Sequence, residues 1–194
     1  VNPIPKAGNV WAIEHSGSDI AATSAIRSLH QFVSSAPSCR QLLLAQRAPE
    51  LDAAVQLTRN YHPTYDSLLL KAFQAKDYFL LVGPPGTGKT SMALQFMVRE
   101  ALAKRQSILL MSYTNRAVDE ICGTLSDNAI DYIRIGNPYS CDKRYRSHLL
   151  TKYIEQHPNL NHIRLQLQSS QVIVGTTSTL QSKTYLFELK SFSM

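Results

Sequence analysis

A phosphate-binding loop constrains this chain more than any other feature. Residues 83–90 read Gly-Pro-Pro-Gly-Thr-Gly-Lys-Thr, which matches the pattern G-x-x-x-x-G-K-[ST] at every fixed position. The loop follows an apolar segment, residues 78–82, that we predict to be a strand, and it leads into residues 90–103, which we predict to be a helix. A strand, a glycine-rich turn and a helix in this order predict an α/β fold that binds a nucleoside triphosphate at the turn.

Each residue type in the loop has a chemical reason. Glycine lets the backbone curl so that successive N–H groups point at phosphate oxygens, and the helix adds its positive dipole end. Lys89 can reach the β- and γ-phosphates, and the Thr90 hydroxyl can ligate Mg²⁺. Lys89 and Thr90 are therefore the catalytic candidates, with Thr90 as the magnesium ligand. The expected nucleotide-binding residues are Gly83, Pro84, Pro85, Gly86, Thr87, Gly88, Lys89, Thr90 and Ser91.

The totals of the chain set broad limits. Its 194 residues suffice for one α/β domain with an appendage, and its net charge of +6 mildly favours an anionic partner. The three cysteines, Cys39, Cys122 and Cys141, have neither zinc-binding nor disulfide-framework spacing, so we expect a reducing, cytoplasmic setting. The apolar runs are too short to span a membrane, so no membrane partner is expected.

We divide the chain into an extension, residues 1–62, and an α/β domain, residues 63–194. The extension begins with an irregular, Pro- and Gly-rich stretch in which Trp11 and Ile13 are candidate anchors. Helices are expected there from Asp19 to Pro37 and over residues 39–46 and 50–62. In the α/β domain we predict further strands over residues 107–111, 132–135 and 171–175, and helices over residues 64–74, 116–125 and 143–169. Strands that alternate with helices predict a parallel sheet covered on both faces.

Two later segments resemble helicase motifs. Residues 112–121, Ser-Tyr-Thr-Asn-Arg-Ala-Val-Asp-Glu-Ile, resemble motif Ia of superfamily 1 helicases, in the branch of the nonsense-mediated-decay helicase and its DNA-processing relatives. Residues 134–136 resemble the strand end that follows this motif, and residues 174–179, Val-Gly-Thr-Thr-Ser-Thr, resemble motif Ic. The motifs stand in the family's order, and the resemblance covers roughly residues 64–185.

The resemblance implies a fold, partners and site residues. The fold is an incomplete P-loop NTPase (RecA-like) parallel sheet flanked by helices, with an N-terminal, mainly helical extension. The protein is expected to be an ATP-dependent helicase that uses ATP and Mg²⁺, binds single-stranded DNA or RNA, and works with a second RecA-like domain of the same parent chain. The resemblance also implies movement from 5′ to 3′. The nucleic-acid-binding candidates are Thr114, Asn115, Arg116, Thr176 and Thr177.

The chemistry of these positions suits a strand of phosphates. Thr114 and Asn115 stand where a strand meets a helix, and Thr176 and Thr177 follow another parallel strand. We therefore expect both pairs at the carboxyl edge of the sheet, where ligands bind in open α/β folds. An ordinary helix cap also explains Thr114–Asn115, and capping and contact can coexist.

Two charged segments are open to more than one interpretation. Lys143-Arg144-Tyr145-Arg146, with Tyr139, His148 and Tyr153 nearby, interleaves basic and aromatic residues. Such a pattern fits a single-strand-binding surface and a solvated helix face equally well. We interpret Asp119-Glu120 as surface or packing residues.

Some parts of a hydrolytic site are not found. No Asp-Glu pair follows an apolar strand between Gly175 and Met194, although residues 185–190 resemble the approach to such a strand. The family's adenine-side glutamine position falls at Asp66. Since the chain starts at Val1 and stops at Met194 within a mixed segment, we expect a fragment of a longer protein. Because the acidic motif is not found, we expect this fragment to bind ATP weakly and to hydrolyse little. Robust single-strand-stimulated hydrolysis, lost on Lys89→Ala, would contradict this.

Two other classes remain open from the sequence. The loop also suits an AAA-type ATPase that remodels proteins, although Thr114–Asp119 favours the helicase. A nucleotide-binding regulatory module without turnover is the third reading. No residue distinguishes DNA from RNA.

Overall fold

A computed structural model of the chain describes residues 20–84 and 86–194, with side chains from residue 25 onward. The expected anchors Trp11 and Ile13 lie outside the described residues. The chain divides into two compact units, residues 1–49 and residues 50–194, so residues 50–62 group with the second unit.

The described part of the first unit, residues 20–49, contains the helices α1 (Ile20–Ser34) and α2 (Pro37–Leu43), close to the predicted bounds. Pro37 begins α2 at a position where no backbone N–H is needed. Arg40 donates a 2.8 Å hydrogen bond from Nη1 to the Val33 carbonyl, which ties the two helices together. Among the described residues, no helix is long and apolar enough to cross a bilayer.

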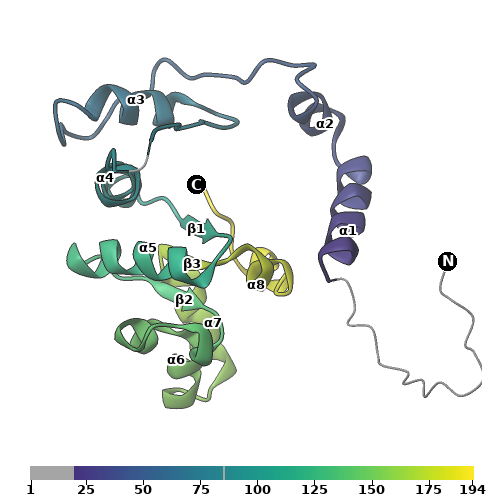
Figure 1. Ribbon diagram of the computed structural model, residues 1–194, viewed down its shortest axis with the longest axis vertical. Coiled ribbons are helices and arrows are strands. Elements are labelled where there is room, and N and C mark those ends of the chain that lie inside the picture. The colour runs from purple at the N-terminus through teal and green to yellow at the C-terminus, as the bar shows by residue number, and fades with distance from the viewer. Residues whose placement is uncertain (1–19, 85) are drawn as a thin grey trace, which may run out of the picture. The chain divides into compact units, whose positions relative to one another are not determined.

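The second unit is built on a parallel sheet of three strands, β1 (Ile108–Ser112), β2 (Ile133–Ile135) and β3 (Val172–Thr176). Their order is β1-β3-β2, so each connection crosses over a face of the sheet, as parallel strands require (Figure 1). Register runs from Ile108↔Val172 to Ser112↔Thr176 on one side of β3 and from Ile133↔Ile173 to Ile135↔Gly175 on the other. The predicted α/β class with a parallel sheet is confirmed.

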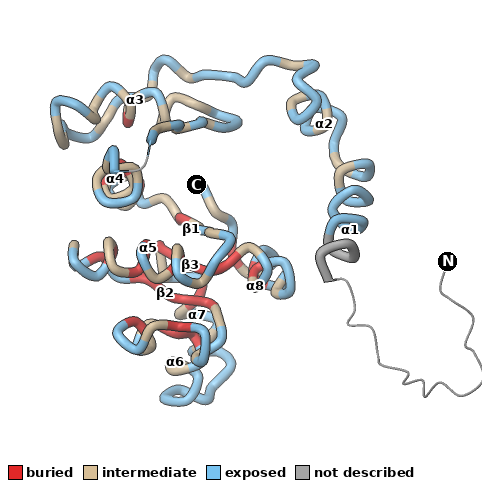
Figure 2. The backbone as a smooth tube through the Cα atoms, viewed as in Figure 1, coloured by how far each residue is buried: buried red, intermediate tan, exposed pale blue. Residues whose placement is uncertain are grey.

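Helices cover both faces of this sheet, since side chains of the strands point alternately to either side. Val172 and Val174 pack with α4 (Leu94–Ala103) and α5 (Asn115–Asp127). Ile173 packs on the other side with Leu167 of α7 (Leu160–Ser169) and with α6 (Leu150–Gln156), α8 (Thr177–Gln181) and α9 (Tyr185–Leu189). Figure 2 shows the buried residues gathered on the strands and on the helix sides that face them.

Shorter elements complete the unit. α3 (Asp66–Gln74) precedes the phosphate loop, and a π-helical turn, η1 (Lys89–Ala93), leads from the loop into α4. Two 3₁₀ turns, η2 (Pro138–Ser140) and η3 (Lys143–His148), stand between β2 and α6. The region predicted as mainly helical, residues 143–169, therefore consists of η3, α6 and α7, with Pro158 in the break between the two α-helices.

The predicted strand over residues 78–82 is wrong: the structure assigns no regular element there. Leu80 and Val82 of this apolar segment are 76% and 91% exposed. A strand requires a hydrogen-bonded neighbour, and none of the described residues forms a ladder with this segment. The free edge of β1 pairs instead with Met194, which donates to Ser107 (3.2 Å) and accepts from Leu109 (2.8 Å).

The helix predicted over residues 50–62 is also wrong. Polar groups of this segment form hydrogen bonds with another element, α4, instead of forming a helix of their own. Glu100 of α4, which is fully buried, accepts hydrogen bonds from the Thr58 N–H (2.9 Å), the Thr58 hydroxyl (2.6 Å) and the Tyr61 hydroxyl (2.9 Å). Burial raises the pKa of Glu100, but these hydrogen bonds and the nearby Lys104 outweigh it and lower the pKa overall. Hydrogen bonds therefore hold Thr58 and Tyr61 against α4, the helix that follows the phosphate loop.

The segment that resembles the approach to a strand, residues 185–190, contains the helix α9. Leu186 is buried in the second core layer, and Lys190 donates a 2.7 Å hydrogen bond from Nζ to the Gln168 carbonyl of α7. The apolar spacing therefore serves one helical face against α7, which a short segment cannot reveal by its pattern alone.

Candidate functional site

The phosphate loop has the backbone that its glycines were expected to allow. Gly86 and Gly88 have φ values of +81° and +75°, in the left-handed region that other residues rarely adopt. At Gly88 the space is also restricted, because a Cβ atom would lie 2.6 Å from the Tyr65 hydroxyl oxygen. Pro85 lies outside the described residues.

The Lys89 side chain folds back over the start of the loop. Its Nζ donates to the carbonyls of Gly83 and Pro84, the latter at 2.5 Å, and Thr87 Oγ1 donates to the Pro84 carbonyl at 2.8 Å. None of the N–H groups of residues 86–89 donates to another described residue, so they are available to phosphate oxygens. Thr90 and Ser91 are exposed at the start of the π-helical turn. This cradle fits the phosphates of a nucleotide, with Thr90 placed to ligate a cation.

The two predicted strand-binding segments meet at one edge of the sheet. β1 and β3 are neighbours whose last aligned pair is Ser112↔Thr176, so Thr114–Arg116 and Thr176–Thr177 both follow the carboxyl ends of adjacent strands. Arg116 is 92% exposed and lies 3.8 Å from Glu120 in a loose ion pair. The structure thus brings together the motifs at residues 112–121 and 174–179.

Both segments also cap helices. Thr114 Oγ1 accepts a 3.2 Å hydrogen bond from the Ala117 N–H and so caps α5, while its side chain remains exposed. Thr176 is only 5% exposed, and its hydroxyl caps α8 by accepting from the Thr179 N–H at 3.2 Å. Thr176 is therefore a positioning residue, and Thr177, half-buried, is the more accessible of the pair.

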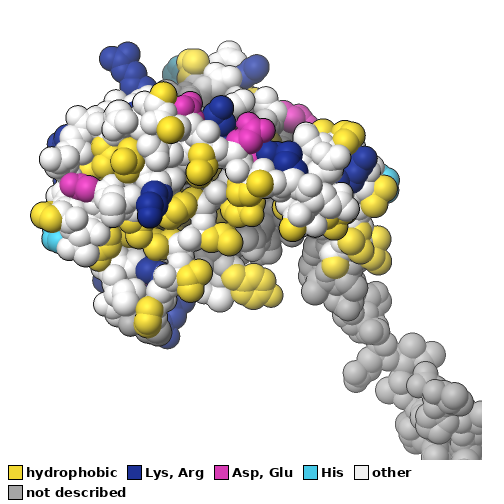
Figure 3. All heavy atoms as spheres, turned by 90° about the horizontal axis from the view of Figure 1, so that it is seen from above, with side chains coloured by type: hydrophobic (Ala, Val, Ile, Leu, Met, Phe, Trp, Pro, Cys, Tyr) yellow, Lys and Arg dark blue, Asp and Glu magenta, His cyan; other side chains and the backbone are white. Residues whose placement is uncertain are grey.

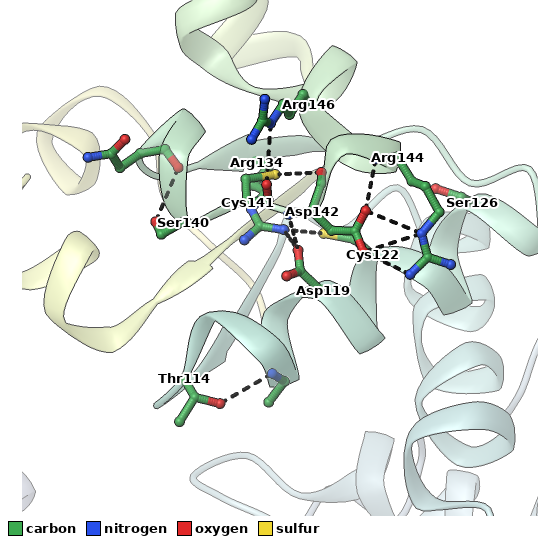
Figure 4. A network of polar contacts seen from close by, with 12 residues as sticks. Thr114, Asp119, Cys122, Ser126, Arg134, Ser140, Cys141, Asp142, Arg144 and Arg146 are labelled. Atoms are coloured by element: carbon green, nitrogen blue, oxygen red, sulfur yellow. Dashed lines mark hydrogen bonds and ion pairs between the residues drawn. The ribbon is translucent and has the colours of Figure 1, made fainter.

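A buried ion pair fixes the helix that carries Thr114–Arg116. Arg134, in the middle of β2 and 1% exposed, pairs with Asp119 of α5. Asp119 also accepts a 3.3 Å hydrogen bond from the Asp142 N–H, so one carboxylate joins β2, α5 and the segment before η3 (Figure 4). Burial lowers the pKa of Arg134, but the hydrogen bond to Asp119 and the electrostatic effects of Cys141, Cys122 and Asp119 together outweigh it, so the pKa is raised overall and the guanidinium stays charged.

Comparison with known proteins places this geometry in a family. A family model described as an AAA domain matches residues 64–192. The chain belongs to this AAA domain family. Among its relatives, the DNA replication ATP-dependent helicase/nuclease JHS1 of Arabidopsis thaliana is 32% identical over 126 residues, 59% of this chain and 9% of that protein.

Two other relatives are also named as helicases. The helicase/nuclease DNA2 of Saccharomyces cerevisiae is 28% identical over 166 residues, 79% of this chain and 10% of its own length. The uncharacterized ATP-dependent helicase MJ0104 of Methanocaldococcus jannaschii is 30% identical over 107 residues, 54% of this chain and 16% of that protein. The chain therefore spans less than a fifth of each relative. Its AAA domain is superfamily 1 helicase-like, as the motifs predicted, whereas the nonsense-mediated-decay branch stays a prediction.

The sequence did not reveal one residue that supports the loop of the AAA domain. The Tyr65 hydroxyl donates a 3.2 Å hydrogen bond to the Thr87 carbonyl, and its ring packs edge-on against Phe96 of α4. Asp66, at the family's adenine-side position, accepts hydrogen bonds from the N–H groups of Tyr61 and His62, both at 2.9 Å, and so fixes the turn before α3. No local sequence pattern around Tyr65 indicates this contact with the loop.

The basic and aromatic segment of the AAA domain separates into packed and free side chains. Tyr145 is buried, His148 stacks on Tyr132 at 4.2 Å between ring centroids, and Tyr153 stacks on His157 at 4.6 Å. Tyr139, in contrast, is 92% exposed. On the face drawn in Figure 3, the described Lys and Arg side chains lie scattered among acidic and hydrophobic ones, so the net positive charge forms no single patch there.

Proposed function

We propose that this AAA domain is the nucleotide-binding and strand-binding part of an ATP-dependent helicase or translocase motor. The observation that carries the proposal is the sheet edge, where two motifs follow the aligned strand ends Ser112 and Thr176, in a chain that also holds a phosphate loop. The named helicase relatives support it over a protein-remodelling ATPase.

The loop would hold the triphosphate of ATP. Its free N–H groups and the ammonium of Lys89 would bind phosphate oxygens, and Lys89 would exchange its contacts with the loop carbonyls for the β- and γ-phosphates. Thr90, with Ser91 beside it, would hold Mg²⁺, which supplies positive charge at the transferred phosphate. Tyr65 keeps the loop against α4.

The strand-binding role would fall on exposed groups at the sheet edge. Capping by Thr114 fixes the first turn of α5, whose remaining N–H groups and the Asn115 side chain can bind phosphate oxygens. Arg116 adds a mobile positive charge, and Thr176 sets the position of Thr177. Because JHS1 and the DNA2 of Saccharomyces cerevisiae are named as DNA replication helicase/nucleases, we propose single-stranded DNA as the ligand.

Hydrolysis would require groups beyond these. No Asp-Glu pair follows an apolar strand between Gly175 and Met194, and in P-loop motors such acidic residues hold Mg²⁺ and orient the attacking water. We propose that a second RecA-like domain of the intact protein supplies arginines, that the intact motor moves from 5′ to 3′, and that these 194 residues alone hydrolyse little ATP.

The strand-binding proposal predicts a salt-dependent affinity that depends on Arg116. Labelled single-stranded DNA and RNA of equal length are titrated with the full 194-residue chain at two salt concentrations. Binding should weaken as salt rises, because phosphate contacts release counterions. Arg116→Ala should weaken binding and reduce the salt slope by roughly one counterion.

The matched control is Arg164→Ala, which removes the same charge from an exposed position on α7. It should leave both the affinity and the slope nearly unchanged. Equal losses in the two variants would mean that only the net charge matters, and no binding at low salt would refute the strand-binding role. Tighter binding of RNA would reassign the ligand.

A further inference from the structure

A hollow of about 460 Å³ lies beside the strand-binding edge, between the first turns of α5 and the segment before η3. Asn115 and Arg116 line one wall, and Ser140 and Arg144 line the other. Of the lining residues, Figure 4 labels Asp119 on α5 and Ser140, Asp142 and Arg144 on the other segment. Because Asn115 and Arg116 belong to the hollow and to the edge, a strand held at the edge passes its mouth.

The charges around the hollow cancel in pairs. Asp119 pairs with the buried Arg134, Glu120 lies 3.8 Å from Arg116, and Asp142 accepts a 2.9 Å hydrogen bond from Arg144. Apart from Arg116, whose pair with Glu120 is loose, each cation at the hollow has an acid in close contact, so a phosphate gains little by entering. A neutral group with many donors and acceptors is better matched, and a nucleobase is such a group.

The hollow also offers a planar group for stacking and a carboxylate that accepts hydrogen bonds, both of which suit a nucleobase. The Arg144 guanidinium lies 5.2 Å from the centre of the Tyr145 ring, and guanidinium planes are surfaces on which bases stack. Hydrogen bonds from Arg144 lower the pKa of Asp142 to about 2, so its carboxylate accepts hydrogen bonds, including that of a thymine N3–H, throughout the neutral range.

Tyr139 extends the aromatic surface into solvent. It directly precedes Ser140 of the hollow, and 92% of its surface is exposed. Its backbone is held, because the Tyr139 N–H donates a 2.9 Å hydrogen bond to Asn137 Oδ1 and Pro138 restricts the turn. No described side chain covers this ring, and an exposed aromatic ring beside a nucleic-acid track is the usual stacking platform for bases.

We propose that the hollow receives one nucleobase of the strand bound at Thr114–Arg116, with Tyr139 stacking on it at the rim. The inference rests on the proposed strand binding and deepens it. Phosphates are held at the start of α5 and respond to salt, whereas the base is held by stacking and hydrogen bonds that respond to salt far less.

The test compares two oligonucleotides with the same phosphates. A labelled oligothymidylate and an abasic oligomer of equal length are titrated with the 194-residue chain by fluorescence anisotropy. The wild-type chain should bind the oligothymidylate about tenfold more tightly, the effect of stacking one base. Tyr139→Ala should remove most of this difference without changing the salt slope, and Tyr139→Phe should keep it because the ring remains.

Leu165→Ala is the control, since Leu165 is 62% exposed on α7 and does not line the hollow. It should leave both affinities unchanged. Equal wild-type affinities for the two oligomers, or an equal loss for both in Tyr139→Ala, would overturn the base site while leaving strand binding intact. Failure to bind either oligomer at low salt would overturn strand binding and the base site together.

Discussion

Asp119→Ala is expected to destabilise the second unit by about 3–5 kcal/mol, the usual effect of removing one partner of a buried ion pair. Arg134 is 1% exposed and cannot reach water, so its charge would remain buried without its carboxylate. The Asp142 N–H would lose its acceptor as well. A domain is stable by about 5–15 kcal/mol, so this variant should unfold at a much lower urea concentration.

Two further variants separate this mechanism from a general loss of charge. Glu120→Ala removes the neighbouring acid, whose side chain is 61% exposed, and should change the stability by less than about 0.5 kcal/mol. Asp119→Leu combined with Arg134→Met replaces both charges by apolar groups and should recover much of the loss. A midpoint for Asp119→Ala equal to that of the wild-type chain would contradict the buried pair.

Gly88→Ala is expected to weaken nucleotide binding by roughly tenfold or more while the unit remains folded. A left-handed backbone costs about 1–2 kcal/mol for a residue with a Cβ atom, and each 1.4 kcal/mol is a factor of ten in affinity. The new Cβ atom would also lie 2.6 Å from the Tyr65 hydroxyl, which must move and release the Thr87 carbonyl. Titration of a fluorescent ATP analogue measures the effect, and urea unfolding checks the fold.

Gly136→Ala is the matched control. A Cβ atom at Gly136 would meet only Arg134 Nε, at 4.0 Å, and the backbone there is not left-handed. Its nucleotide affinity should equal that of the wild-type chain. If Gly88→Ala also bound with the wild-type affinity, the loop would not need the conformation that the structure shows.

The sequence predicted those features that depend on short stretches of chain. The glycine pattern predicted a curled loop, in which Gly86 and Gly88 have left-handed backbones. Polar residues after apolar strands predicted the shared edge of Thr114 and Thr176. The prediction of a strand over residues 78–82 was wrong because a strand needs a hydrogen-bonded neighbour, and the local sequence pattern does not show whether one is present. The prediction of a helix over residues 50–62 was wrong for a similar reason. Glu100, 42 positions away from Thr58 in the sequence, accepts hydrogen bonds from this segment.

Polar residues that act from inside the fold were the hardest to predict. Arg134 lies between Ile133 and Ile135, where alternation alone would place an exposed polar residue, but all three residues are buried. Only Asp119 on the covering helix explains the burial of the Arg134 charge. Asp119 itself was interpreted as a surface or packing residue, whereas it joins three segments. Tyr139 and Tyr145 have the same side chain in the same segment, yet Tyr139 is exposed whereas Tyr145 is buried with its hydroxyl against Gly123.

Nucleotide binding at residues 83–90 is decided by one calorimetric titration of ATP, with Mg²⁺, into the wild-type chain and Lys89→Ala. The wild-type chain should show saturable binding at one site. Lys89→Ala should bind roughly tenfold more weakly or worse, because charged hydrogen bonds contribute about 1.5–3 kcal/mol each. Lys143→Ala, which removes the same charge from an exposed position in η3, should bind like the wild-type chain. Equal affinity in the wild-type chain and Lys89→Ala, or no binding by the wild-type chain, would contradict a nucleotide site at this loop.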